Sequence, residues 1–271
     1  SHLVLIAGVA VVVLPVYIAL IASTHGPTDF LSGVVPMLPG PHALENYAAM
    51  LGSGISRAGA PPLAPMLLNS LLMAAVIAVG KIAISIVSAY AIVYFRFPGR
   101  VFAFWIIFVT LMLPVEVRIM PTYKVVADLS MLNSYAGLTI PLIASATATF
   151  LFRQFFLTVP EELIEAARVD GAGPVKFFLD VLLPLSRTNI AALFIILFIY
   201  GWNQYLWPLL ITTDTRYYTV VMGIKRMAAA AEADPQWNLV MAAVILAMLP
   251  PVLVIVFMQR LFIRGLIETE K

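Results

Sequence analysis

Long apolar runs dominate this sequence and restrict it to a membrane-spanning fold. Six stretches of about 20 residues carry few charges, and that is the length an α-helix needs to cross a bilayer. Of the 271 residues, 62% are hydrophobic and 11% are charged, and the mean hydropathy is +1.00. We therefore predict an all-α, polytopic membrane protein that forms one domain, residues 1–271, with six transmembrane helices. The predicted spans are 3–22, 67–94, 101 to about 120, 135–152, 189–211 and 239–262.

The charged segment at residues 161–184 lies between two of these spans and shows helix boundaries of its own. Thr158 and Glu161 have the spacing of a capping box, and Pro160 suits the first turn of a helix. We therefore predict a short helix that starts near residue 159. Gly171 is expected to end it in a left-handed turn.

A second short helix is predicted after the first, because Pro174 suits a helix start and Pro184 is expected to end the helix. On the first helix, one face should carry mostly small and apolar side chains and another mostly charged ones. The first face comprises Leu163, Ala166, Ala167 and Asp170, and the second comprises Glu161, Glu165 and Arg168. Two such helices can sit in a cleft of another protein. These residues alone also allow an amphipathic helix in the lipid headgroups.

The same segment carries a motif at fixed offsets, Glu165-Ala166-Ala167, then Gly171, then Leu183-Pro184. It resembles the cytoplasmic coupling loop of ABC-importer permeases, and only Val181 departs from that pattern, where Ile is usual. Nearly the whole chain is similar to the second permease subunit of carbohydrate-type importers. Stretches such as FRFPGR, TLMLPVEVRI and IYGWNQYLWPLL look closer still to the permeases of bacterial sn-glycerol-3-phosphate importers.

This resemblance implies a function and a set of partners. The chain would be a permease subunit of an ATP-driven ABC importer, and would move glycerol 3-phosphate or a related glycerophosphodiester across the bacterial plasma membrane by alternating access. It would pair with a homologous second permease, two ATPase subunits that hold ATP and Mg, and an external solute-binding protein. The loop at 158–185 would couple to the ATPases through Glu165, Ala166, Ala167, Asp170, Gly171, Leu183 and Pro184.

Enzymatic activity is not expected of this chain. Gly80-Lys81 is no phosphate-binding loop, because position 75 is Ala and position 82 is Ile, and no other segment has that motif. We therefore predict no catalytic residue, no bound cofactor and no metal site. The absence of Cys excludes disulfides and thiolate metal sites. A net charge of +2 gives no indication of nucleic-acid binding.

The placement of Lys and Arg predicts the orientation in the membrane. Segments on the side of residues 161–184 hold nine of them, and those on the opposite side hold six. Because cytoplasmic loops are enriched in these residues, the loop and both termini are predicted to be cytoplasmic. The longest exterior segment, residues 23–66, is expected to be a loop with one short amphipathic helix near 44–51. It could serve as a lid or as a docking surface for an external protein.

Polar residues near or within the second and third spans are candidates for the transport pathway. Lys81 lies in the middle of the second span, where a charge must face protein or water. It could form a structural pair, donate a hydrogen bond between packed helices, or lie in the substrate path. Pro114 and Pro121 are expected to break the third span near its outer end, and broken spans commonly line cavities. Glu116 and Arg118 beside this break could meet substrate or lie in the headgroups.

The fifth span carries Trp202, Asn203 and Gln204 at its centre. At least one of the two amides must face another helix or the pathway, because hydrocarbon offers no hydrogen-bond partner. Gly201 beside them allows close approach or bending. Residues 144–149, ASATAT, are interpreted instead as a helix-packing surface.

A sugar importer, an ion-coupled secondary transporter and a non-transporting scaffold are the alternative functions. Lys81 alone is poor support for ion coupling.

Overall fold

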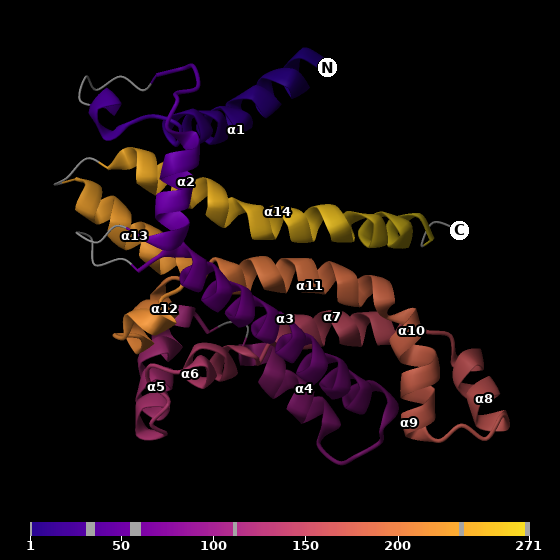
Figure 1. Ribbon diagram of the computed structural model, residues 1–271. Coiled ribbons are helices and arrows are strands. Elements are labelled where there is room, and N and C mark those ends of the chain that lie inside the picture. The colour runs from indigo at the N-terminus through magenta and orange to yellow at the C-terminus, as the bar shows by residue number, and fades with distance from the viewer. Residues whose placement is uncertain (1, 31–35, 55–60, 111–112, 233–235, 269–271) are drawn as a thin grey trace. The chain divides into compact units, whose positions relative to one another are not determined.

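Helices make up the regular secondary structure of the described chain, where no strand occurs. A computed structural model describes the protein except residues 1, 31–35, 55–60, 111–112, 233–235 and 269–271, and except the side chains of 115, 116 and 260–268 (Figure 1). The prediction of an all-α fold is confirmed.

The helices have the following bounds in chain order. The first half of the chain contains α1 (His2–Ala22), η1 (Pro27–Phe30), α2 (Ala43–Gly52), α3 (Leu63–Tyr94), α4 (Arg100–Val109), α5 (Val115–Asp128), α6 (Tyr135–Thr139) and η4 (Ile140–Leu142). The second half contains α7 (Ala146–Phe156), α8 (Glu161–Val169), α9 (Pro174–Phe177), the π-helix η5 (Phe178–Leu182), α10 (Leu183–Leu185), α11 (Arg187–Trp202), α12 (Leu206–Ile211), η6 (Thr215–Tyr217), α13 (Val220–Ala231) and α14 (Trp237–Glu268).

Three described helices, α1, α3 and α14, are each long and apolar enough to cross a membrane. Two bent pairs add a span each if every pair is counted once. Tyr135–Leu142 meets Ala146–Phe156 at 45°, and Pro174–Leu185 meets Arg187–Trp202 at 69°. The short apolar helix α4 has 10 residues. The described chain is therefore consistent with several membrane crossings, while the count of six stays a prediction.

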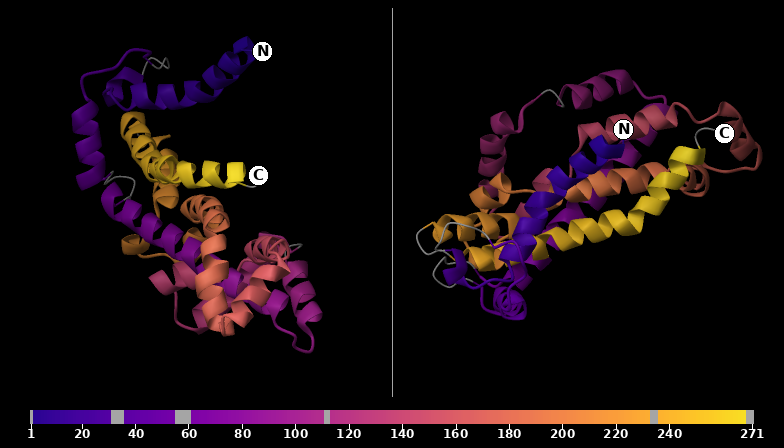
Figure 2. Two further views of the ribbon diagram at one scale, coloured as in Figure 1. Left: turned by 90° about the vertical axis from the view of Figure 1, so that its right-hand side faces the viewer. Right: turned by 90° about the horizontal axis from the view of Figure 1, so that it is seen from above.

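The predicted third span is shorter than expected. Helix α4 ends at Val109, and α5 begins after Pro114, which adopts an extended ψ of 146°. The right-hand view of Figure 2 shows α5 turned away from the line of α4. The predicted break at Pro114 is confirmed. The predicted break at Pro121 is wrong, because α5 continues through this residue and loses only the hydrogen bond of one missing N–H.

The chain folds into two compact units. The first comprises Ser1–Leu72 and Trp202–Val252, and the second comprises Met73–Gly201 and Leu253–Lys271. Helices α3, α11 and α14 contribute residues to both. The expectation of one membrane domain over residues 1–271 stays a prediction.

In the first unit, α2 confirms the helix predicted near residues 44–51. The buried Asn46 amide anchors it by donating to the carbonyl oxygens of Ser23 and His25 at 2.9 and 2.8 Å. Asn238 on α14 in turn donates to the Asn46 side-chain oxygen at 3.0 Å. Buried amides require such partners. Leu44, by contrast, is 86% exposed, so α2 has one anchored side and one open side.

In the second unit, two glycines let α3 approach its neighbours closely. A Cβ added at Gly201 of α11 would lie 2.8 Å from the Cα atom of Ala74. A Cβ added at Gly80 of α3 would lie 2.8 Å from Ile143. The close approach predicted at Gly201 is confirmed, and it brings α11 and α3 together at Ala74.

Candidate functional site

The 158–185 segment confirms the prediction that Gly171 ends a helix in a left-handed turn. Gly171 follows α8 with a φ of +73°. The amide of Ala172 donates to the Ala167 carbonyl at 2.8 Å, and the amide of Gly171 donates to the Arg168 carbonyl at 3.0 Å. This pair of bonds is the Schellman motif. A residue with a Cβ adopts this backbone conformation at a cost of about 1–2 kcal/mol, so the turn depends on glycine.

The start of α8 differs from the prediction. The Thr158 hydroxyl donates to the Phe155 carbonyl at 2.7 Å and caps no amide of α8. Pro160 is the N-cap, and the helix begins at Glu161. The predicted capping box is therefore wrong, because Thr158 belongs to the turn that ends α7. The helix begins two residues after the start predicted near residue 159.

The second helix of the segment begins at Pro174, as predicted, and continues past Pro184. The helical stretch ends at Leu185, one residue after the end predicted at Pro184. A π-helix over Phe178–Leu182 precedes this proline. Proline has no N–H, and its ring crowds the carbonyl four residues earlier in a regular α-helix. The wider π-helical turn relieves this crowding, so the chain passes Pro184 before it bends into α11.

The sides of α8 also differ from the prediction. Only Ala167 of the predicted apolar face is buried, while Leu163, Ala166 and Asp170 are exposed. The packing side includes Ala167 and the half-buried Ile164, which line a cavity of about 210 Å³ with residues from the end of α3. Glu165 is exposed, so this helix presents its acidic side chain outward.

A cluster of aromatic rings, here called the aromatic anchor, holds the segment to the end of α3. The Tyr90 hydroxyl donates to the Pro174 carbonyl at 2.8 Å, and its ring centroid lies 5.0 Å from that of Phe178. The Tyr94 ring lies 5.5 Å from Phe177. Neither tyrosine is among the residues predicted from the sequence. Their spacing of four residues at the last turns of α3 places them on one helix face and was the available signal.

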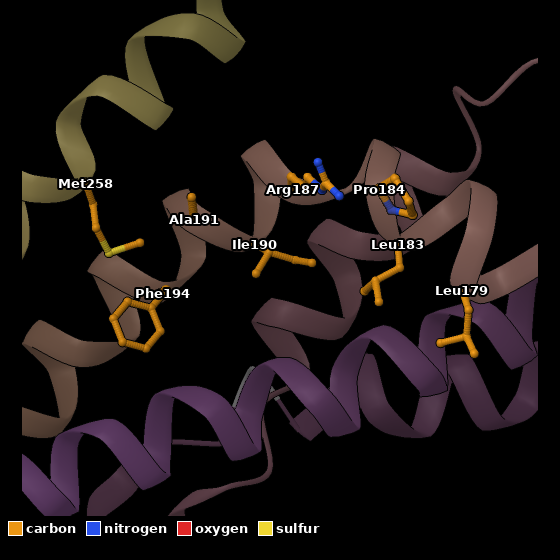
Figure 3. A pocket seen from close by; sticks show the side chains of 8 residues that line it. All are labelled: Leu179, Leu183, Pro184, Arg187, Ile190, Ala191, Phe194 and Met258. Atoms are coloured by element: carbon orange, nitrogen blue, oxygen red, sulfur yellow. The ribbon is translucent and has the colours of Figure 1, made fainter.

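The last two motif residues line an apolar groove of about 650 Å³. Leu183 and Pro184 share it with residues of α11 and with Met258 of α14. Figure 3 shows the Arg187 side chain directed away from Leu183 and Ile190. Leu183 and Pro184 thus lie where the segment bends into α11, which favours a role in setting the direction of that helix.

Lys81 and Arg118 line the same cavity in the second unit, which has a volume of about 730 Å³. Lys81 is 7% exposed, and its ammonium lies 3.9 Å from the ring centroid of Tyr200. The start of α7 also lines the cavity through Ala146 and Thr147. The sequence favoured helix packing over ligand binding for this stretch. The buried Ala148 and Thr149 do pack, but the helix start faces the cavity.

The structure places the other predicted pathway residues as follows. Trp202, Asn203 and Gln204 belong to the first unit, where α11 ends at Trp202 and α12 resumes at Leu206. Trp202 is buried, Asn203 is exposed and Gln204 is half-buried. The continuous fifth span predicted over 189–211 is wrong, because the helix is interrupted at 203–205. Glu116 lies in α5, and its side chain is outside the described part of the structure.

The fold is shared with a solved bacterial transport protein. The structure matches that of a bacterial ABC transporter involved in the import of the acidic polysaccharide alginate with a TM-score of 0.80. The match covers 96% of this chain and 94% of the other at 20% sequence identity, so it shows a common fold. Among the described residues, no group of three His, Asp or Glu side chains gathers where it could hold a metal ion.

The chain belongs to the family of binding-protein-dependent transport system inner membrane components, whose family model matches residues 81–268. It is 58% identical to the sn-glycerol-3-phosphate transport system permease protein UgpE of Brucella melitensis. It is 57% identical to the proteins of that name from Rhizobium meliloti and Salmonella typhi. Each match covers 100% of this chain and 96% of the relative. Family membership makes this chain a transport permease of the inner membrane.

Proposed function

We propose that this chain is the transmembrane permease subunit of an ATP-driven ABC importer for glycerol 3-phosphate or a related glycerophosphodiester. The observation that carries the substrate class is full-length identity of 56–58% to proteins named as sn-glycerol-3-phosphate permeases. The chain would move its solute across the bacterial plasma membrane by alternating access. Both termini and the 158–185 segment would lie in the cytoplasm, as the distribution of Lys and Arg favours.

The proposed assembly contains three kinds of partner. A homologous permease would complete the membrane pathway, and an external solute-binding protein would deliver the substrate. Two ATPase subunits would hold ATP and Mg, since this chain has no phosphate-binding loop of its own. One of those ATPases would receive the 158–185 segment.

The shape of α8 supports this docking role. Glu161, Glu162 and Glu165 are all exposed. The first two lie in the first turn, where acidic side chains interact favourably with the helix dipole. Ala166 is exposed and small, so another surface can approach the helix backbone closely. The partner cleft should therefore offer basic side chains or N–H donors.

The aromatic anchor supplies a route from the ATPases to the membrane. A docked ATPase that closes would pull α8 and α9, and Tyr90 and Tyr94 would pass this displacement to α3. The same helix carries Lys81 nine residues before Tyr90, a separation of about 14 Å along a helix with a rise of 1.5 Å per residue. Movement at the loop would thereby reach the cavity through one rigid element.

Reconstitution tests this function. Purified chain, homologous permease and ATPase are placed in proteoliposomes with the loaded binding protein, and uptake of labelled glycerol 3-phosphate is measured. We expect uptake only with ATP and all subunits present. Preferential uptake of a neutral sugar would contradict the proposed substrate. Uptake driven by a proton gradient with an inactive ATPase would contradict the proposed ATP-driven mechanism. Robust ATP hydrolysis by the pure chain alone would contradict the permease role.

Reversal of charge at Glu165 tests the docking role. In Glu165→Lys, ATPase stimulation by the loaded binding protein should fall about tenfold, the effect of 1.4 kcal/mol in docking. Asp128→Lys reverses an exposed charge on α5 outside the segment and should leave stimulation unchanged. Equal stimulation in both variants and in the unmodified complex would remove Glu165 from the ATPase contact.

A further inference from the structure

The cavity that contains Lys81 and Arg118 has the composition of an anion site. Its described lining includes no acidic residue. Two cations, several hydroxyl groups and one aromatic ring face a volume of about 730 Å³, within the size range of small-molecule sites. The polar lining residues are Lys81, Ser88, Thr110, Arg118, Ser145, Thr147, Thr149 and Tyr200.

Lys81 is the most buried charge in this lining. It is 7% exposed and makes no hydrogen bond or ion pair with any described residue. The Tyr200 ring covers one side of the ammonium at 3.9 Å, which offsets part of the cost of burying the charge. An ammonium has three N–H donors, and a ring face satisfies only part of this capacity. The remaining donors are available to an anion in the cavity.

The start of α7 adds a second positive element. The span that contains it is broken, with a 45° bend before Ala146. The Ser145 side chain caps the helix by accepting from the Ala148 amide at 3.3 Å. The amides of Ala146 and Thr147 make no hydrogen bond to the described residues, and both residues line the cavity. Helix starts of this kind, within broken membrane spans, attract anionic groups of a substrate.

Arg118 approaches the cavity from α5 and completes the set. Its carbonyl accepts from Thr122 at 2.7 Å, while its guanidinium makes no ion pair with a described carboxylate. A guanidinium can hold two oxygens of one phosphate group at once. Arg118 is exposed and lies four residues after Pro114, at the break between α4 and α5.

We propose that this cavity is a transit site for the phosphate group of the substrate, formed by Lys81, Arg118 and the first amides of α7. The proposal rests on the proposed function, since it gives the imported solute a phosphate. Arg118 receives the phosphate, and Lys81 and the α7 amides hold it deeper in the membrane. The hydroxyl groups of the lining leave polar partners for the glycerol portion.

A charge test at Thr147 separates binding from folding. Thr147 is exposed at the helix start and makes no side-chain hydrogen bond in the described structure, so a larger polar residue fits there. In the reconstituted complex, Thr147→Glu should lower glycerol 3-phosphate uptake at least about tenfold by repelling the phosphate, while Thr147→Gln, of the same size, should keep at least about half. Assembly and ATPase stimulation by the loaded binding protein should persist in both variants.

Neutral replacements complete the experiment. Lys81→Gln and Arg118→Gln should each raise the substrate concentration for half-maximal uptake about tenfold or more, with Lys124→Gln on α5 as a control that leaves it unchanged. Equal uptake by Thr147→Glu and Thr147→Gln in assembled complexes would overturn the transit site. If the unmodified complex imports only a neutral sugar, the proposed function fails first and this inference fails with it.

Discussion

The 158–185 segment and the cavity around Lys81 lie in the same unit but are stabilised in opposite ways. In the segment, the acidic side chains are exposed, and the conformation depends on a left-handed glycine and on the aromatic anchor. In the cavity, the key charge is buried over a ring, without a described carboxylate beside it. The fold of the segment should therefore tolerate a new side-chain charge, but a change that affects the backbone conformation should be costly. The cavity should tolerate neither loss of charge nor a charge of the wrong sign.

Gly171→Val should give the largest effect in this comparison. Valine at a φ of +73° costs about 1–2 kcal/mol or more, so the Schellman turn should open and α9 should lose its direction. We expect normal membrane insertion and pairing with the second permease, and at least a tenfold loss of ATPase stimulation and uptake, measured in the reconstituted complex, since about 1.4 kcal/mol corresponds to tenfold.

Gly173→Val is the matched control for this change. A Cβ at either glycine meets no atom within 4 Å, but Gly173 has a φ of −70° and an extended backbone. Valine accepts that conformation readily. Equal loss of stimulation in the two variants would show that side-chain bulk, and not the left-handed turn, matters in this segment.

Tyr200→Leu should give an intermediate effect at the cavity. The substitution removes the ring beneath the Lys81 ammonium and with it about 0.5–2 kcal/mol of cation–π stabilisation. Uptake should fall about threefold, and the thermal midpoint of the purified complex should decrease, as about 1 kcal/mol lowers it by a few degrees. Tyr200→Phe also lacks the hydroxyl but keeps the ring, so the difference between the two variants isolates the ring. Identical transport and stability in both would contradict a contribution from this contact.

Tyr90→Phe should give the smallest effect and would sharpen the role of the anchor. The change deletes the hydrogen bond to the Pro174 carbonyl, worth about 0.5–1.5 kcal/mol, and retains the ring contacts. More ATP should be hydrolysed per solute imported, by about twofold, while total hydrolysis changes little. The control is Tyr94→Phe, which removes a longer bond of 3.3 Å to Phe156, outside the segment. An unchanged ratio in Tyr90→Phe would limit the tyrosine to a structural role.

Local features of the sequence predicted much of the segment. Gly171 was expected to end a helix in a left-handed turn, and Pro174 was expected to start one, because both signals act on neighbouring residues. The same approach failed at Thr158, whose hydroxyl bonds a carbonyl of the preceding turn. It also did not predict the π-helix that precedes Pro184. A competing local hydrogen bond decided the role of Thr158, and spacing alone does not rank such competitors.

The sequence by itself determined the all-α membrane class, the position of the motif and the presence of costly polar groups within the apolar stretches. Those properties follow from composition and from neighbours along the chain. Only the tertiary structure decided that Lys81, Arg118, Thr147 and Tyr200 line one cavity, and that Tyr90 holds the segment. These contacts depend on how α3, α5, α7 and α11 pack and where their helices break. Such long-range packing has no signature in the spacing of any one stretch, because each partner comes from a different part of the chain.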